Sequence, residues 1–211
     1  MLFRLVRAYA VRPILGLRTF RALQAYRGAQ EDLRDSSTGD TAVAQLQLAS
    51  DRTGLPRDFV ARTVERWMEQ EPLPLLRGYM QPGVEAFLSA CQDAGIALAA
   101  LSDYPPDAKL EAMGLKVFIG ATFCAQNPNI GVFKPDPKGI RVALELLGVP
   151  ANRAIYVGDR VDVDAVAAHA AGIACAILTR QPAAPTDKHV RVASFAELTV
   201  RLFGPETNGS A

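Results

Sequence analysis

Two aspartates stand close together after a short apolar run. The run, Ile155 to Val157, is of strand type and stops at Gly158, and Asp159 and Asp164 follow with the spacing G-D-x-x-x-x-D. In a parallel sheet, the carboxyl end of a buried strand opens onto the ligand crevice. Mg²⁺ prefers a few carboxylates together with water and a substrate phosphate. The stretch therefore predicts a metal site, and the alternative is a helix N-terminus whose dipole the acids stabilise.

Two further polar sites have the residue types that hold a phosphoryl group. Ser102 and Asp103 directly follow the apolar run 96–101, and Lys134 lies in the loop VFKPDP, which Pro135 stiffens. A hydroxyl and free backbone N–H groups can bind phosphoryl oxygens, and a lysine can offset charge on a phosphate and on an attacking carboxylate. The alternatives are an ordinary turn at Ser102 and a solvated loop lysine at Lys134.

The elements that would position these side chains alternate after Pro82 and Gly83. The pattern of apolar residues predicts helices at Val84–Ala94, Asp107–Met113, Pro137–Leu147 and about Val161–Ala170, and strands at Ile96–Leu101, Lys116–Gly120, Ala154–Val157 and Ile173–Leu178. Alternation at this spacing implies right-handed crossovers and a parallel sheet, so the fold class is α/β.

Residues 1 to about 80 read as helical throughout, with no strand. We expect a segment before Pro13, a long helix over 14–34 with Phe20, Leu23 and Tyr26 near one face, and two shorter helices after breaks at 36–40 and 53–56. Four apolar residues recur at helical spacing before Pro72 and Pro74 end the region, and they are expected in the core: Phe59, Val60, Val64 and Trp67.

Composition limits the class of protein. The chain has 211 residues, 49% of them hydrophobic, and a net charge of +1, which suits one α/β domain with a modest addition. No run of eighteen apolar residues appears, so we expect no membrane span, and we also expect no nucleic-acid partner. The three cysteines have no disulfide or metal spacing, and Cys175 suits a buried thiol; this favours a reducing, cytoplasmic location.

Six arginines and no acid occupy the first thirty residues; they are Arg4, Arg7, Arg12, Arg18, Arg21 and Arg27. A mitochondrial transit peptide is one interpretation, although the stretch has no serine. An amphipathic helix on anionic lipid is another, although Pro13 interrupts its apolar face. We favour the third, a pair of solvated helices whose arginine stems cover apolar neighbours.

Three segments in order resemble motifs II, III and IV of the haloacid dehalogenase (HAD) superfamily. They are LSDYPPDAKLEAMGL, FKPDPKGI and YVGDRVDVDAVAAHAAGI, and the resemblance covers roughly residues 80 to 180. The helical first eighty residues are similar to the cap that many members insert after their first strand. The resemblance implies a helical cap over 1–80, a Rossmann-like parallel core over 81–203 and a disordered tail over 204–211.

The same resemblance implies phosphoryl transfer through an aspartyl phosphate on a small phosphorylated metabolite. One aspartate attacks phosphorus, a second acts as general acid and base, and Mg²⁺ shields the charges. By motif position, Ser102 and Asp103 would bind the phosphoryl group, Lys134 would stabilise the nucleophile and intermediate, and Asp159 and Asp164 would hold or orient Mg²⁺. The acidic metal motif favours a phosphatase over a dehalogenase. We expect the protein to be a monomer or a homodimer.

The sequence departs from the family at its beginning. Members start with an apolar strand ending in D-x-D, whereas no aspartate precedes Asp32 here. Asp32, Asp35 and Asp40 lie on or after a helix with no buried strand before them, so none is expected to be the nucleophile. In the family the missing strand is central, between the strands that precede Ser102 and Asp159, and its loss leaves interior backbone unpaired.

Three accounts of this departure stay open. The chain is an N-terminally shortened version of a longer phosphatase, through a misplaced start or a truncation, which is the account we favour. Alternatively, it is a binding or regulatory protein that keeps the phosphate pocket without the chemistry. In the third account, a partner chain completes the sheet.

Overall fold

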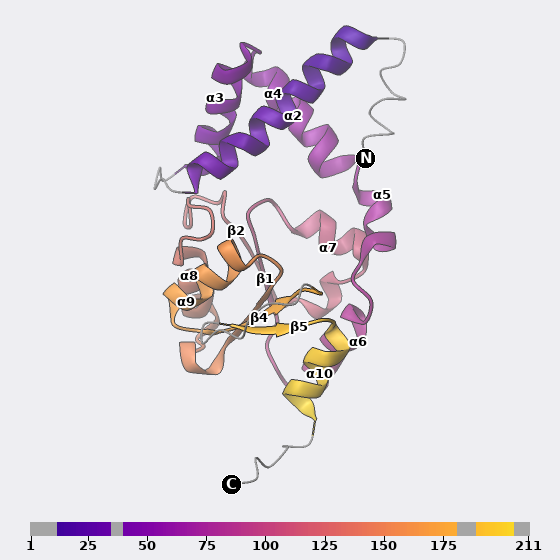
Figure 1. Ribbon diagram of the computed structural model, residues 1–211, viewed down its shortest axis with the longest axis vertical. Helices are drawn as coiled ribbons and strands as arrows, with labels where there is room; N and C mark the ends of the chain where they lie inside the picture. Colours follow the sequence, from indigo (N-terminus) through magenta and orange to yellow (C-terminus); the bar gives the residue numbers. More distant parts are fainter. Residues whose placement is uncertain (1–11, 35–39, 181–188, 205–211) are drawn as a thin grey trace.

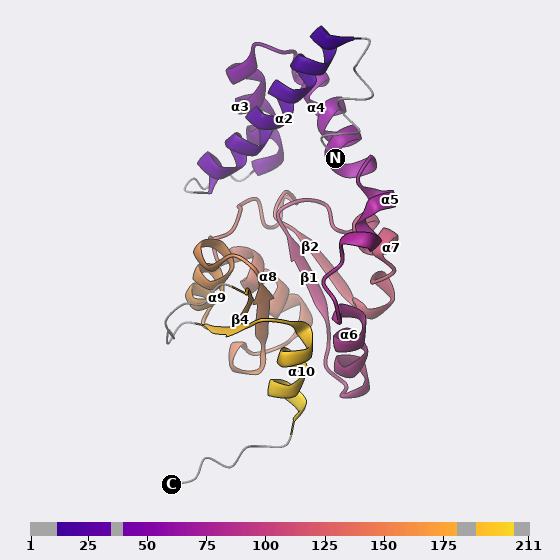
Figure 2. The same cartoon turned by 45° about the vertical axis from the view of Figure 1, so that its right-hand side comes forward.

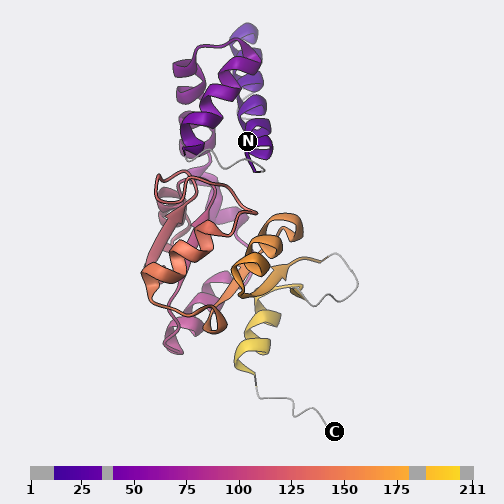
Figure 3. The same cartoon turned by 90° about the vertical axis from the view of Figure 1, so that its left-hand side faces the viewer.

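The structure is a computed structural model that describes residues 12–34, 40–180 and 189–204. The expectations for the segment before Pro13, for residues 35–39 and for the tail from residue 205 lie outside the described residues. Helices of the N-terminal part lie at one end of the molecule, and the strands with their flanking helices lie at the other (Figures 1 and 3). The two parts contact each other at the C-terminal end of the first described helix, α2, and where residues Leu73–Leu76 pack against Asp107–Met113.

The N-terminal part is helical in all its described elements. These are α2 (Pro13–Leu33), α3 (Thr41–Thr53), α4 (Arg57–Val64), the π-helix η1 (Glu65–Gln70), α5 (Leu73–Leu76) and the 3₁₀ turn η2 (Arg77–Tyr79). The helical path continues past Pro72 and Pro74, contrary to the expected end, because proline is tolerated in a first helical turn. Val60, Val64 and Trp67 are buried as expected. Of the three residues expected near one face of α2, Leu23 and Tyr26 are buried and Phe20 is 39% exposed.

Within the described residues, five short strands form two parallel sheets. They are β1 (Ala99–Ser102), β2 (Ala121–Cys124), β3 (Ile155–Gly158), β4 (Ala174–Leu178) and β5 (Val190–Val192). The strand β1 pairs with β2, and β3, β4 and β5 pair in that order, all in parallel. The parallel α/β architecture predicted from the sequence is therefore confirmed.

The crossover helices lie on both sides of the strands (Figures 1 and 2). They are α6 (Val84–Asp93), α7 (Asp107–Met113), α8 (Lys138–Leu147), the π-helix η5 (Val161–Ala165) with α9 (Val166–Ala171), and α10 (Phe195–Phe203); the 3₁₀ turns η3 (Lys116–Phe118) and η4 (Ala151–Arg153) connect them. Each predicted helix after residue 83 is found within a few residues of its expected bounds. The strand β5 and helix α10 were not predicted.

The prediction of a strand at Lys116–Gly120 is wrong. Residues Lys116–Phe118 form a 3₁₀ turn, closed by hydrogen bonds from Phe118 N to Leu115 O and from Ile119 N to Lys116 O, and the strand begins at Ala121. Phe118 and Ile119 pack against the apolar cluster around α6 from this turn. The apolar run thus suggested a strand, although only Phe118 and Ile119 pack against the core and Val117 is exposed.

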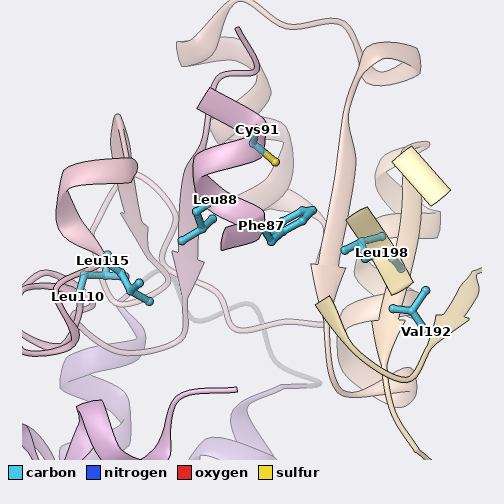
Figure 4. Packing of buried hydrophobic residues seen from close by; sticks show 8 residues of the cluster. Phe87, Leu88, Cys91, Leu110, Leu115, Val192 and Leu198 are labelled. Carbon is cyan, nitrogen blue, oxygen red and sulfur yellow. The ribbon is translucent and has the colours of Figure 1, made fainter. Parts of the chain in front are cut away.

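Alternate side chains of β4 enter two separate apolar clusters. Cys175 and Ile177 pack with α8 and α9, whereas Ala176 packs with α6, α7 and α10. Figure 4 shows the second cluster, in which Phe87 and Leu198 approach each other from α6 and α10. A strand covered on both faces must be apolar at every position, which accounts for the unbroken run ACAIL. Cys91, Cys124 and Cys175 are free and buried, as the absence of a disulfide pattern predicts.

The two sheets are not hydrogen-bonded to each other. Among the described residues, β1 pairs only with β2, and β3 pairs only with β4. Yet Ala100 of β1 and Val157 of β3 pack against one apolar cluster, and Leu101 and Tyr156 pack against the other. Hence β1 and β3 contribute to the same two apolar clusters without pairing through backbone hydrogen bonds in the described residues. Ile155, at the start of β3, is 42% exposed.

Candidate active site

The predicted site residues lie at the carboxyl ends of the strands. Ser102 is the last residue of β1, Lys134 lies in the loop between β2 and α8, and Asp159 directly follows β3. Asp164 belongs to η5, the first turn after β3. Parallel strands present their carboxyl ends at one edge, and this edge faces the C-terminal end of α2 (Figure 2).

Lys134 and Asp164 meet in a buried ion pair. Lys134 Nζ donates to Asp164 Oδ1 at 2.7 Å, and the side chains are 14% and 5% exposed. The remaining Asp164 oxygen, Oδ2, accepts from the backbone N–H groups of Asp159 and Arg160, each at 3.1 Å. Both carboxylate oxygens of Asp164 are therefore occupied, and the residue fixes the turn that carries Asp159.

Tyr156 completes this cluster from within β3. Its hydroxyl accepts from Lys134 Nζ at 3.1 Å and donates to Asp164 Oδ1 at 3.3 Å. Burial raises the pKa of Tyr156 to about 12. Sequence reasoning missed this residue, although a tyrosine in a strand of otherwise apolar residues is a signal that its hydroxyl needs a partner.

Opposite charges outweigh burial in setting the protonation of the pair. Burial disfavours both charged forms, but Lys134 and the N–H donors hold the pKa of Asp164 below its usual range. Likewise, Tyr156, Asp103 and Asp164 raise the pKa of Lys134 above its usual value despite its burial. A lysine that stays charged in a buried loop is suited to offsetting the charge of a phosphoryl group.

Ser102 and Asp103 make the turn after β1. Ser102 Oγ accepts from Tyr104 N at 3.2 Å, so the side chain helps to form a turn, as the alternative interpretation has it, while its proton stays available to a ligand. Asp103 Oδ2 accepts from Gln30 Nε2 at 2.8 Å and from Arg34 Nη1 at 3.0 Å. Asp103 Oδ1 is buried without a hydrogen-bond partner among the described residues.

The end of α2 contacts all three loops of the site. Arg34 donates to Asp103 and to the backbone carbonyl of Lys134, and Glu31 pairs with Arg160 Nη1 at 3.3 Å. Sequence reasoning missed Gln30, Glu31 and Arg34, because their partners are far away along the chain and no local pattern marks them. The N-terminal helices are thus anchored on the residues predicted to bind phosphate.

The donor set can contribute to a Mg²⁺ site but does not form one alone. Asp159 is exposed, and Asp164 is committed to Lys134 and the backbone. No group of three or more His, Cys, Asp or Glu side chains that could hold a metal occurs in the part of the chain that the structure describes. Mg²⁺ is often bound by one or two carboxylates with water and a substrate phosphate, so Asp159 fits as a ligand and Asp164 as the residue that orients it.

A family model of haloacid dehalogenase-like hydrolases matches residues 4–172. The chain belongs to this family. It is 32% identical over 206 residues to a phosphoglycolate phosphatase of Rhodospirillum rubrum, a match that covers 92% of this chain and 74% of that protein. It is 34% identical over 95 residues to a phosphoserine phosphatase of Thermus thermophilus, covering 44% of this chain and 38% of that protein.

Solved structures show the HAD fold as well. The L-2-haloacid dehalogenase of Xanthobacter autotrophicus matches with a TM-score of 0.62 and 18% identity, over 92% of this chain and 90% of that one. A HAD phosphatase of Thermococcus onnurineus matches with a TM-score of 0.57 and 21% identity, over 87% and 88%. The family resemblance predicted from the three motifs is confirmed. This HAD-like chain spans less than two thirds of several curated relatives, 38%, 42% and 58% of three of them.

Proposed function

We propose that this HAD-like chain carries the phosphate-binding and metal-binding residues of a phosphohydrolase for a small phosphate monoester. The observation that supports the proposal most is the buried Lys134–Asp164 pair, which joins the loop after β2 to the turn after β3. Ser102 would bind the phosphoryl group, and Lys134 would offset its charge. Asp159 would hold Mg²⁺, which when bound neutralises phosphoryl charge. The named relatives act on phosphoglycolate and phosphoserine, which are phosphate monoesters of small acids.

The family reaction needs an aspartate that we propose is absent from this chain. In that reaction a carboxylate oxygen attacks phosphorus, the bond to the leaving oxygen breaks, and a second aspartate protonates the leaving alcohol. Water then attacks the aspartyl phosphate, which releases inorganic phosphate and restores the carboxylate. Here Asp32 pairs with Arg52, and Asp40 caps α3 by accepting from Val43 N at 3.0 Å. Two of the three first aspartates thus have structural roles away from Lys134, and Asp35 lies outside the described residues.

The separation of the two sheets supports the same proposal. A strand that carries the nucleophile would lie between β1 and β3, which share apolar clusters without backbone pairing in the described residues. We propose that this chain binds phosphate without hydrolysing the ester. A non-catalytic phosphate-binding or regulatory role is the alternative to a phosphatase that needs an added strand.

Turnover and binding should be measured separately. With p-nitrophenyl phosphate and Mg²⁺, this chain is expected to show no turnover. Inorganic phosphate should bind in titration calorimetry, and Ser102→Ala should weaken that binding. Asp159→Asn should abolish any dependence of phosphate binding on Mg²⁺, with Asp162→Asn as the matched control, because Asp162 is an exposed acid of the same turn. Hydrolysis that Asp159→Asn abolishes and Asp162→Asn spares would show that the chain holds its own nucleophile.

Other expectations from the sequence stay predictions. They are the division into a cap and a core near residue 80, the monomeric or homodimeric state, the absence of a nucleic-acid partner and the cytoplasmic location. In the described residues, no helix has the length and apolar character that crossing a membrane requires.

A further inference from the structure

A hollow of about 640 Å³ lies beside the candidate active site, between α2, the segment from η1 to α5, and α7. Its lining includes Arg27, Gln30, Met68, Leu76, Tyr104 and Lys109. Pockets for drug-sized ligands measure about 300–1,000 Å³. A water molecule in the liquid takes about 30 Å³. An acid of two carbons is only a few water molecules in size, so the hollow is far larger than such an acid needs.

Two cations from different helices face this hollow. Arg27 comes from α2 and Lys109 from α7, and neither has a carboxylate within 4 Å in the residues that the structure describes. Glu31 also lines the hollow, but its carboxylate accepts from Arg34 at 2.9 Å and from Arg160 at 3.3 Å. Glu69 acts on Lys109 only from a longer distance. The charge available to a ligand is therefore positive.

The remaining lining is apolar and partly aromatic. Met68, Pro72 and Leu76 supply aliphatic surface, and the ring of Tyr104 lies 5.6 Å from Lys109 Nζ, measured to its centroid. The Tyr104 hydroxyl donates to Gln30 Oε1 at 2.6 Å and accepts from Gln45 Nε2 at 2.9 Å, which fixes the ring. Lys109 Nζ lies over this ring, and Tyr26 stacks against it with the ring centroids 6.0 Å apart, so the fixed ring adds an aromatic wall that carries a cation.

We propose that this hollow binds an organic anion with an aromatic or extended apolar body, whose charge Arg27 and Lys109 hold. The apolar body of this anion is the leaving group of the phosphate ester; this assignment rests on the proposed function. Tyr104 directly follows Asp103, and Gln30 donates to Asp103 Oδ2 while it lines the hollow. One ligand can therefore reach from Arg27 and Lys109 to the turn at Ser102.

Titration calorimetry on the whole chain tests the binding site without any turnover. The probes are acetate, 2-naphthoate and inorganic phosphate, used with the wild type and with Arg27→Gln, Lys109→Met and Ser102→Ala. The matched control is Arg21→Gln, which removes a charge from an exposed position on the same helix outside the hollow. Circular dichroism confirms that each variant is folded before binding is compared.

Wild type and control should bind 2-naphthoate about tenfold or more tightly than acetate, because only naphthoate covers the apolar wall. Arg27→Gln and Lys109→Met should each weaken naphthoate about tenfold, the usual loss for one charge-assisted contact, and leave phosphate binding unchanged. Ser102→Ala should weaken phosphate binding and leave naphthoate binding unchanged. The proposal is overturned if naphthoate does not bind, or if it binds the two hollow variants as tightly as it binds Arg21→Gln. Phosphate binding would still support the proposed function in either case.

The phosphate ester of 1-hydroxy-2-naphthoate tests the leaving-group role. This ester should bind more tightly than naphthoate or phosphate alone, and Arg27→Gln, Lys109→Met and Ser102→Ala should all weaken it. An ester no tighter than naphthoate would show that the hollow is an anion site separate from the phosphate site, and the leaving-group assignment would then be wrong. If phosphate alone fails to bind the wild type while naphthoate binds, the proposed function fails and the hollow stands.

Discussion

Asp164 accepts at once from the Lys134 ammonium at 2.7 Å and from the backbone N–H groups of Asp159 and Arg160 at 3.1 Å. A single carboxylate therefore ties the loop after β2 to the turn after β3. The two sheets are not hydrogen-bonded to each other among the described residues, so this contact links them where backbone pairing does not.

Lys134→Met should destabilise the protein strongly. Removing Lys134 leaves the Asp164 carboxylate buried without an opposite charge, and such losses cost about 3–5 kcal/mol of unfolding free energy. The double variant Lys134→Met with Asp164→Asn should cost less than the sum of the single changes, since neither charge is then stranded. Urea denaturation measures both effects. Arg201→Ala breaks an exposed pair with Glu197 and should cost within about 1 kcal/mol; an equal cost for Lys134→Met would contradict the structural role.

Acid should destabilise the protein through Asp164. Its pKa is lowered in the folded state, so its contribution is present above the ordinary aspartate pKa and is lost as pH falls through the folded value. The pKa of Lys134 is raised, so its contribution is lost only as pH rises above the ordinary lysine range. Urea midpoints measured from pH 6 down to pH 3 should fall, and Asp164→Asn should flatten this fall more than Asp162→Asn. If the urea midpoint falls equally with pH in the two variants, Asp164 is not the group responsible for the acid sensitivity.

Gly158→Ala should destabilise the end of β3. A Cβ at this position would lie 2.5 Å from Asp164 Cβ and 2.5 Å from Asp164 Oδ2, and the buried aspartate has no room to move. Overpacking of this kind costs about 1–3 kcal/mol. Gly78→Ala is the control, because nothing lies within 4 Å of its Cβ and its effect should stay within about 0.5 kcal/mol. Thermal unfolding of both variants checks the difference.

The local pattern of apolar residues was sufficient to predict an element where the buried residues have the spacing of that element. Helix α7 has the predicted bounds, Asp107–Met113. The strand β4 begins one residue after its predicted start, and its three central residues, Cys175, Ala176 and Ile177, are buried. The run at 116–120 misled because Phe118 and Ile119 pack against the core, only partly buried, from a 3₁₀ turn, while Val117 is exposed. Pairing with β1 begins only at Ala121, and pairing is a property of two strands that one run does not reveal.

Helix α10 carried a readable signal. Ser194 Oγ accepts from Glu197 N at 3.2 Å, and Glu197 Oε2 accepts from Ala193 N at 2.8 Å, an S-x-x-E arrangement close to a capping box. The contacts of Gln30 and Arg34 had no such signal, because Asp103 lies 73 and 69 residues away along the chain. Motif order placed Ser102, Lys134, Asp159 and Asp164 at strand ends, but only tertiary packing shows which of them touch.

Arg34 should control the docking of α2 on the phosphate loops. Its guanidinium donates to Asp103 Oδ2 at 3.0 Å and to the Lys134 carbonyl, and the Arg34 and Asp103 side chains are 10% and 13% exposed. Arg34→Ala should cost about 2–4 kcal/mol of unfolding free energy, because it leaves a nearly buried carboxylate with fewer donors. Arg34→Lys should recover only part of the loss, since an ammonium does not match the planar fork.

Hydrogen exchange distinguishes local release from global unfolding in the Arg34 variants. Loss of the clamp should raise exchange in α2 and in the turn at 102–104 more than in β4, because α2 is attached to the strands through this contact. Arg52→Ala removes the exposed partner of Asp32 and should leave exchange in the turn unchanged. Uniform faster exchange across β4 and the turn would instead mean that Arg34 supports overall stability without a specific role in docking.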